Sequence, residues 1–285
     1  MQFISDSSAI EKDRLLAQHQ AALTLLQRAL LNPTVNEYKW LDLACGRGQI
    51  INHLHEVLER PQRQKISYHG YDIKVDYIAI TEKKAENLDL CSVQVQVGQM
   101  EQFPTLNSPE VKYDFITFTN TAHEIDFRSL PIVLIEGILR LNDTGCLFVY
   151  DMEKLPDLEL ELGAITWSRE EIQELVEVIL TELGVTGGLQ FPTGRWKHST
   201  VYGWNIQLHR EYLGLTDDEI NESKGNTIEK SIDKLVELLR RKYISTKSAL
   251  DAMTKYGPGS KEEATQLQRY LYDFYSLSRA LEVIA

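Results

Sequence analysis

Residues 40–49 read WLDLACGRGQ, and this stretch decides how the rest of the chain is interpreted. It begins as an apolar strand, reaches an acid at Asp42 and turns through small residues that include Gly46 and Gly48. Glycines in such a turn let a ligand approach the backbone closely. Because helical character begins near Gln49, the stretch predicts a strand, a ligand-binding loop and a helix in direct succession.

The spacing of the glycines argues against a dinucleotide as the ligand. A dinucleotide-binding turn has a third glycine three residues after the second, which lets the helix pack tightly on the strand. Here that position is Ile51, so the loop lacks the pattern that cradles a pyrophosphate. The loop instead follows Asp42, and an acid at this place favours a ligand with a cationic head and no phosphate.

Four segments downstream have the apolar patterning of strands. They are residues 65–73, 91–100, 113–120 and 145–152, and helical patterns occupy 76–88 and 128–141. Repeated alternation of strands and helices predicts βαβ units and a parallel sheet. In such a sheet the ligand binds at the carboxyl ends of the strands. The polar and glycine residues that end these segments are therefore the candidate site residues.

The motif D-x-A-C-G-x-G at residues 42–48, with the strands that follow it, resembles the first motif of class I (Rossmann-like) S-adenosylmethionine-dependent methyltransferases. The resemblance covers about residues 38–210. It implies an α/β fold with a seven-stranded, mostly parallel sheet and helices on both faces. The implied cofactor is S-adenosylmethionine (SAM). The cofactor-binding residues that the resemblance implies are Asp42, Ala44, Gly46, Gly48, Asp72, Ile73, Gln99, Met100 and Asn120.

Three of these residues have specific roles in the resemblance. Asp72, at the end of the second strand, is expected to accept hydrogen bonds from both ribose hydroxyls. Ile73 is expected to lie against the adenine. Gln99 stands where the family often has an acid that contacts the adenine amino group, and its carbonyl can make the same kind of contact.

The best catalytic candidates follow the fourth strand, whose end faces the methyl group in the family. Methyl transfer from a sulfonium mainly requires that the acceptor be positioned and, for an O–H or charged N–H group, deprotonated. Histidine has a reference pKa near neutral, which makes His123 a candidate general base. Glu124 is a candidate to orient His123 or to bind a cationic acceptor. The alternative is that Asn120 shapes the turn while His123 and Glu124 are ordinary polar loop residues.

Two further groups of residues are candidates for binding the methyl acceptor, and the sequence does not decide between them. Asp151 and Glu153 end the fifth strand and could bind substrate or a metal, but the pattern of acids is too loose to predict a metal site. Residues 191–198 combine basic and aromatic side chains that could hold an anionic or stacked substrate. A structural loop anchored by Trp196 is the competing interpretation.

Composition narrows the class of protein. The chain has 285 residues, 43% hydrophobic content and a formal net charge of −12, which suits a folded protein and disfavours a nonspecific nucleic-acid binder. No apolar run is long enough to predict a membrane helix, and no secretory signal is visible. The cysteines Cys45, Cys91 and Cys146 lie in or beside predicted buried strands or the cofactor loop and lack metal-binding spacing. We therefore expect a cytoplasmic protein with reduced thiols.

The pattern divides the chain into an N-terminal helix (residues 1–34), a SAM-binding domain (35–210) and a helical C-terminal extension (211–285). Within the domain, a helix capped at Ser168 and a strand over 200–209 complete the sheet. Thr216 begins a capping box, and the extension breaks at the glycines around Pro258. The extension is a candidate substrate lid, dimer contact or docking site for a partner. Its basic residues around Lys242 indicate a solvated helix face.

These features predict a SAM-dependent methyltransferase that acts on an oxygen or nitrogen atom, with a small-molecule acceptor. The segment after the fourth strand reads NTAH, which lacks the Asn/Asp-Pro-Pro-Tyr/Phe tetrapeptide expected for methylation of base or glutamine amino groups. An RNA or protein methyltransferase and a SAM-binding regulatory or scaffold protein with little turnover remain alternatives. An NAD-dependent reductase is disfavoured because the third glycine and a Tyr-x-x-x-Lys pair are both missing.

Overall fold

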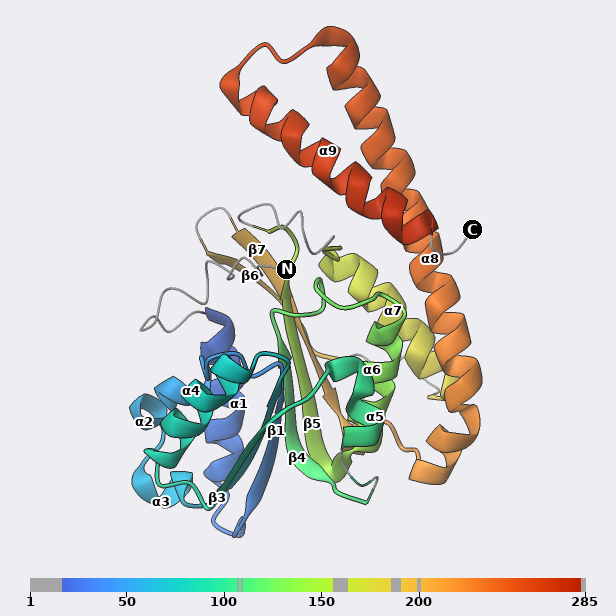
Figure 1. The fold of residues 1–285 in the computed structure, drawn as a ribbon. Helices are drawn as coiled ribbons and strands as arrows, with labels where there is room; N and C mark the ends of the chain where they lie inside the picture. The colour runs from blue at the N-terminus through green and yellow to red at the C-terminus, as the bar shows by residue number, and fades with distance from the viewer. Residues whose placement is uncertain are drawn as a thin grey trace.

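The computed structural model describes residues 17–106, 108, 110–155, 164–185, 191–198 and 201–282. Seven strands form one sheet in the order β3-β2-β1-β4-β5-β7-β6 (Figure 1). The strands are β1 Tyr38–Leu43, β2 Ile66–Asp72, β3 Ser92–Val97, β4 Tyr113–Thr119, β5 Leu141–Met152, β6 Thr193–His198 and β7 Val201–His209. Strands β1 to β5 are mutually parallel, whereas β7 and β6 are added antiparallel. The expected seven-stranded, mostly parallel sheet is confirmed.

Helices cover both faces of the sheet (Figure 1). One face carries α1 Ala17–Leu30, α2 Leu54–Val57, α3 Arg60–Arg63 and α4 Val75–Glu86; the other carries α5 Phe103–Leu106, α6 Ser129–Leu139, α7 Arg169–Glu182 and the first half of α8 Asp217–Tyr256. Two hydrophobic clusters fill the space between sheet and helices, one on each face. On the α1 face, the rings of Trp40 and Tyr68 meet edge to face at 4.9 Å. This double layering explains why most residues of the central strands β1 and β4 are buried.

The helix expected to follow the glycine loop is broken into pieces. A 3₁₀ turn at Ile51–His53 leads into α2, which ends after four residues where Leu58 is extended (φ −122°, ψ 133°). Pro61 has no N–H to donate to the carbonyl four residues earlier, so one continuous helix cannot run through it. The capping box formed by Glu59 and Gln62 then begins α3. Local proline chemistry therefore overrides the predicted single helix.

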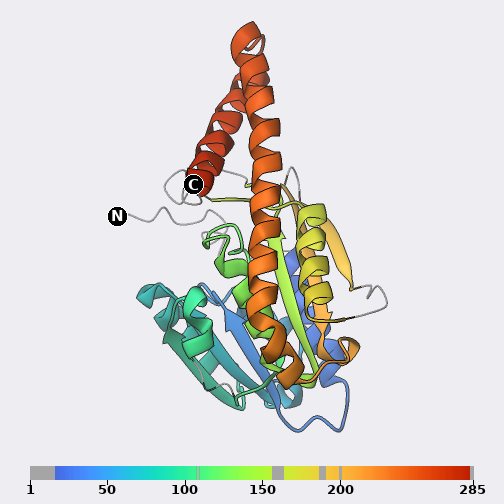
Figure 2. The same ribbon diagram turned by 90° about the vertical axis from the view of Figure 1, so that its right-hand side faces the viewer.

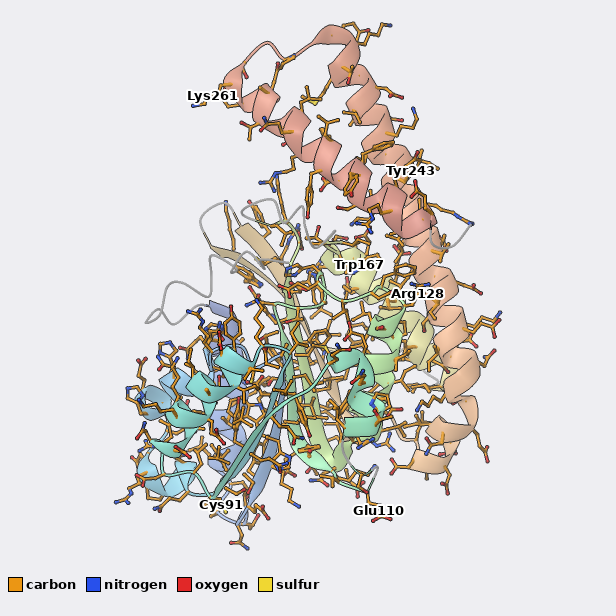
Figure 3. All side chains as sticks on the ribbon, in the orientation of Figure 1. Cys91, Glu110, Arg128, Trp167, Tyr243 and Lys261 are labelled. Atoms are coloured by element: carbon orange, nitrogen blue, oxygen red, sulfur yellow. The ribbon has the colours of Figure 1, made fainter. Side chains whose placement is uncertain are left out.

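The N-terminal helix is confirmed as packing against the sheet. The structure describes α1 from Ala17, and its buried apolar residues are Ala22, Leu23, Leu26 and Leu30. The preceding part of the predicted segment, residues 1–16, lies outside the described residues. Cys45 and Cys146 are buried as expected, but Cys91 is exposed (Figure 3). It precedes β3, which is the edge strand of the sheet and is mostly solvent-facing.

The C-terminal extension forms two long helices. The expected capping box at Thr216 begins α8, which runs for 40 residues and ends where Gly257 adopts a positive φ of 70°. The first half of α8 buries Ile220 and Leu235 in the same core as α6 and α7. The second half projects beyond the sheet, and α9, Lys261–Glu282, folds back above the edge where β1 to β5 end (Figures 1 and 2).

Aromatic and polar contacts fix the two helices in this position. Tyr243 of α8 stacks on Phe274 of α9 with ring centroids 5.2 Å apart (Figure 3). The Lys224 ammonium of α8 forms an ion pair with the buried Glu136 carboxylate of α6. Within the described ranges, no helix combines the length and the apolar character needed to cross a membrane.

Candidate active site

The glycine loop after β1 has a strained backbone. Ala44, Gly46 and Gly48 have positive φ angles of 55°, 56° and 70°. Glycine adopts this conformation without penalty, whereas alanine in it costs about 1–2 kcal/mol. Side chains of α4 hold the loop: the Thr81 hydroxyl donates to the Gly46 carbonyl at 2.8 Å, and the Lys84 ammonium donates to the Arg47 carbonyl at 2.8 Å. The strain at Ala44 is thus maintained by its surroundings, as is common where a ligand binds.

Asp72 ends β2, and its carboxylate links this strand to the glycine loop by a hydrogen bond. One carboxylate oxygen accepts the Gly46 N–H at 2.9 Å, and the other accepts the Lys74 N–H at 2.9 Å. A carboxylate has about four lone-pair positions, so two remain for ribose hydroxyls. Burial raises the pKa of Asp72, and the backbone hydrogen bonds from Lys74 and Gly46 oppose that rise. Ile73 beside it is 52% exposed, which leaves an apolar surface open for a base.

Asp42 lies beneath the loop rather than at its surface. The Thr117 hydroxyl donates to one of its oxygens at 2.6 Å and the Tyr68 hydroxyl donates to the other at 3.0 Å. The residue is 2% exposed, and burial raises the pKa of Asp42 to about 7. Asp42 is therefore enclosed by the protein, with both oxygens bonded to neighbouring hydroxyls, and is not placed for direct contact with a ligand.

The two candidate cofactor residues after β3, Gln99 and Met100, differ in their exposure to solvent. Gln99 is exposed and follows the end of the strand, where its amide is accessible. Met100 is 5% exposed and belongs to the core cluster that includes Phe103. Gln99 is thus accessible from solvent, whereas Met100 is committed mainly to packing.

Asn120 ends β4 with a positive φ of 56°, and its N–H donates to the Tyr150 carbonyl at 2.9 Å. Its side-chain oxygen is buried and has no hydrogen-bond partner in the described part of the chain. Buried polar atoms are nearly always paired, so this oxygen is available to accept a hydrogen bond from a ligand at the strand end.

His123 and Asp151 meet at the carboxyl ends of β4 and β5. The imidazole Nδ1 lies 2.7 Å from Asp151 Oδ1, and the His123 backbone N–H donates to Asp151 Oδ2 at 2.8 Å. Their side chains are 1% and 2% exposed. Glu124 Oε1 lies 3.8 Å from His123 Nε2, and the Glu124 side chain is 33% exposed. The structure therefore places the two predicted catalytic residues side by side.

Sequence reasoning missed the role of Asp151 as the partner of His123. It assigned Asp151 and Glu153 to substrate or metal binding, but Glu153 forms an ion pair with Arg195 at 2.6 Å. Across the described residues, no group of three metal-ligating side chains converges on one point. The signal that could have found the pair is positional, because Asp151 lies at the carboxyl end of one predicted strand and His123 follows the end of its neighbour.

The basic and aromatic stretch around Trp196 is a strand and not a loop. Residues Thr193–His198 form β6, and Trp196 packs on Tyr150 with ring centroids 5.0 Å apart. The anchored-tryptophan interpretation is therefore supported by the packing. Residues 186–190, which precede this stretch, lie outside the described residues.

The residues present fit SAM. The loop offers a strained, closely approachable backbone, Asp72 has lone pairs for two hydroxyls, and Asn120 has an orphaned buried oxygen. These groups lie at the carboxyl ends of β1, β2 and β4, which are adjacent in the sheet. This is where an open α/β sheet binds its ligand.

Comparison with known proteins gives the same assignment. A family model described as a methyltransferase domain matches residues 35–186, just over half of the chain. No curated protein matches. Similar solved structures include the magnesium protoporphyrin IX methyltransferase of Synechocystis PCC 6803 with bound SAH (12% identity, TM-score 0.49, 71% of this chain and 91% of that chain). Others are an rRNA methylase from Streptococcus thermophilus (12%, 0.45, 69% and 98%) and a SAM-dependent methyltransferase from Aquifex aeolicus (18%, 0.45, 72% and 98%). On the family match, the chain belongs to the methyltransferase-domain family and is a class I SAM-dependent methyltransferase.

Proposed function

We propose that the chain transfers a methyl group from SAM to an oxygen or nitrogen atom of a small molecule, with His123 as the general base. The observation that carries this proposal is the buried hydrogen bond between His123 Nδ1 and Asp151 Oδ1 at 2.7 Å. Asp151 lies near the end of β5, next to Tyr150, whose carbonyl accepts the N–H of the predicted cofactor residue Asn120.

The contacts of Asp151 set the tautomer of His123. Its carboxylate accepts the backbone N–H of His123 at 2.8 Å and that of Met152 at 2.6 Å. Because an ionised carboxylate only accepts hydrogen bonds, Nδ1 carries the imidazole proton. The lone pair is then on Nε2, which faces Glu124. A histidine oriented by a carboxylate in this way is the arrangement used for proton abstraction in many enzymes.

The chain's own residues have three tasks in this reaction. SAM supplies a methyl group on a sulfonium, which is already an activated leaving group. Asp72 and the glycine loop hold the cofactor's ribose and orient it toward the end of β4. His123 Nε2 takes the proton from the acceptor as the new bond to carbon forms. Glu124, 3.8 Å from Nε2 and 33% exposed, stabilises the resulting imidazolium and borders the solvent.

The preference for a small molecule is supported by charge and by the segment after β4. The net charge of −12 disfavours a long phosphate backbone as the acceptor. The NTAH segment provides a histidine in place of the tetrapeptide typical of base or glutamine methylation.

The test is a kinetic comparison of His123→Gln with wild type. Pools of hydroxyl- and amino-containing metabolites are incubated with SAM, and release of S-adenosylhomocysteine is measured. We expect His123→Gln to lower kcat by about 10² to 10⁴ and to leave SAM affinity unchanged. His55→Gln, on the exposed face of α2, is the matched control.

Full activity of His123→Gln would assign His123 to a structural role. SAM binding without turnover on any pool would favour the regulatory or scaffold alternative. Melting temperatures of both variants show whether a loss of rate reflects unfolding, because Asp151 loses its partner in His123→Gln.

A further inference from the structure

Thr81 lies in α4 beneath the glycine loop, and the motif that predicts the cofactor site does not include it. Its side chain is fully buried, and its hydroxyl donates to the Gly46 carbonyl at 2.8 Å. A Cβ added to Gly48 would lie 3.2 Å from the same hydroxyl oxygen. Thr81 therefore lies against both glycines of the loop motif.

Thr81 uses its hydroxyl differently from three other helical threonines of this chain. Inside a helix, a threonine hydroxyl commonly donates to a carbonyl of the preceding turn. Thr24, Thr227 and Thr265 do so, each with the carbonyl four residues earlier. Thr81 instead donates out of its helix, so its hydroxyl fixes the loop and not α4.

Gly46 needs fixed partners because glycine itself does not select one conformation. Glycine adopts positive and negative φ about equally readily, so the φ of 56° at Gly46 has to be set by its surroundings. Both of its backbone groups are bonded: the N–H donates to Asp72 Oδ2 at 2.9 Å, and the carbonyl accepts from Thr81. On the next residue, the Arg47 carbonyl accepts from Lys84 at 2.8 Å. Helix α4 thus holds two successive carbonyls of the loop.

The hydrogen bond from Thr81 sets the direction of the peptide group between Gly46 and Arg47. This peptide is trans, and in a planar trans peptide the carbonyl and the following N–H point in opposite directions. Since the Gly46 carbonyl points to Thr81, the Arg47 N–H points away from α4. Within the described residues this N–H has no hydrogen-bond partner. It is therefore available to an acceptor atom of a ligand that approaches the loop.

We propose that Thr81 is a positioning residue for SAM: its hydroxyl holds the Gly46–Arg47 peptide in the orientation that binds the cofactor. The Thr81 side chain is fully buried, so it acts through the loop backbone and not by contact with the ligand. The proposal goes beyond the proposed function, because it concerns the cofactor alone. It holds whichever acceptor is methylated and whichever group acts as the base.

The test compares two ways of changing Thr81. Thr81→Val keeps the shape of the side chain and removes the hydroxyl, whereas Thr81→Ser keeps the hydroxyl. Calorimetric titration measures Kd for SAM and S-adenosylhomocysteine, and hydrogen–deuterium exchange measures the opening of residues 44–48 without ligand. We expect Thr81→Val to raise both Kd values by about five- to thirtyfold and to speed exchange of the loop amides, because the Gly46 carbonyl loses its partner. Thr81→Ser should stay within about threefold of wild type in Kd.

Thr227→Val is the matched control. Thr227 is also fully buried, and its hydroxyl donates to the Ser223 carbonyl at 3.0 Å within α8. We expect this variant to leave Kd and loop exchange unchanged, whatever its effect on melting temperature. Thr81→Ala also lacks the hydroxyl and should raise Kd at least as much as Thr81→Val, so it serves as the second variant if the valine protein does not fold.

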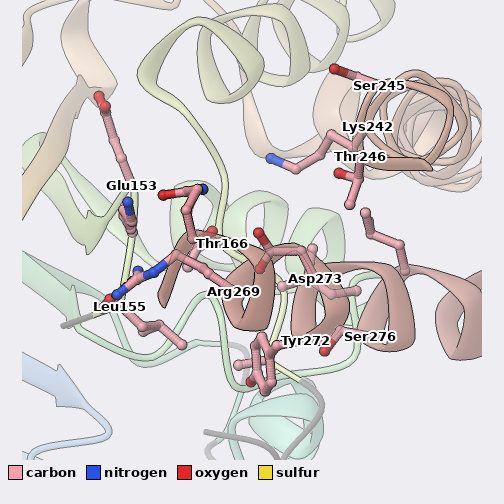
Figure 4. A pocket seen from close by; sticks show the side chains of 15 residues that line it. Glu153, Leu155, Thr166, Lys242, Ser245, Thr246, Arg269, Tyr272, Asp273 and Ser276 are labelled. Carbon is pink, nitrogen blue, oxygen red and sulfur yellow. Dashed lines mark hydrogen bonds between the residues drawn. The ribbon is translucent and has the colours of Figure 1, made fainter. Parts of the chain in front are cut away.

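The cavity drawn in Figure 4 provides a contrasting outcome. It has a volume of about 330 Å³, and its described lining, from the residues after β5, those before α7, and α8 and α9, includes neither Thr81 nor a candidate cofactor residue. A cofactor bound there would leave Kd of Thr81→Val within about twofold of wild type, and that result would overturn the proposal.

Two further results would also contradict the role of the Thr81 hydroxyl. Equal weakening of SAM binding by Thr81→Ser and Thr81→Val, or by Thr227→Val, would show that the hydroxyl beneath the loop is not the cause. A rise in Kd without faster exchange of residues 44–48 would show that Thr81 does not act by holding the loop. Because these measurements need no methyl acceptor, they are independent of the kinetics of His123→Gln.

Discussion

Asp72 gives the sharpest test of the cofactor site. Its two oxygens each accept one backbone N–H, from Gly46 and Lys74, at 2.9 Å. The remaining lone pairs are available for the two ribose hydroxyls. A hydrogen bond to a charged group contributes about 1.5–3 kcal/mol, so even the lower value for two bonds gives about 3 kcal/mol. That corresponds to somewhat more than a hundredfold in Kd.

We expect Asp72→Ala to weaken SAM binding by at least about tenfold, because water that enters the vacated space recovers part of the loss. Calorimetric titration measures Kd for SAM and S-adenosylhomocysteine, and both should weaken by the same factor because both carry the ribose. Asp76→Ala, an exposed acid in the first turn of α4, is the matched control. Asp72→Asn keeps one oxygen for the Gly46 N–H and should have an intermediate effect.

A Kd for Asp72→Ala within about twofold of wild type, in protein with an unchanged melting temperature, would refute the ribose assignment. A loss for SAM but not for S-adenosylhomocysteine would also contradict it, because the two ligands differ only at the sulfur.

The remaining predictions concern stability. Burial raises the pKa of Asp42 to about 7, above its value in the unfolded chain, so its contribution to stability is present at low pH and lost as pH rises through about 7. Denaturant unfolding should show the stability of wild type relative to Asp42→Asn falling by about 2 to 3 kcal/mol between about pH 5 and pH 8, and parallel curves would contradict the burial argument. At Gly203, an added Cβ would lie 2.1 Å from the ring of Trp196. Gly203→Ala should therefore cost about 1–3 kcal/mol and red-shift tryptophan fluorescence, whereas Gly225→Ala, in open space on α8, should be neutral or slightly stabilising.

Much of the fold could be predicted from local patterns. The glycine loop, the ends of the parallel strands and the capping boxes at Ser168 and Thr216 are set by residues close together in sequence. Asp72 was predicted from its place at the end of β2, and the structure joins it to the loop through the Gly46 N–H. Strand ends in a parallel sheet converge on one edge, so these residues could be assigned to a common site without coordinates.

Other features depended on neighbours that the local pattern does not specify. Asp151 and His123 are 28 residues apart and meet only because β4 and β5 are adjacent. Asp42 was expected to influence a cationic ligand, but Thr117 and Tyr68 from the neighbouring strands enclose it. Lys242 was interpreted as part of a solvated face, yet its ammonium donates to the Glu171 carboxylate of α7 at 2.7 Å, because α8 packs beside α7.

The sequence by itself determined the class of fold and the cofactor loop, because hydrophobic periodicity and glycine backbone freedom act over short stretches of chain. The tertiary structure alone decided which acid lies against His123, how Asp42 is enclosed, and where α9 lies relative to the sheet. These outcomes arise from contacts between elements distant in sequence. Such contacts depend on the packing of whole helices against the sheet, and no single segment encodes that packing.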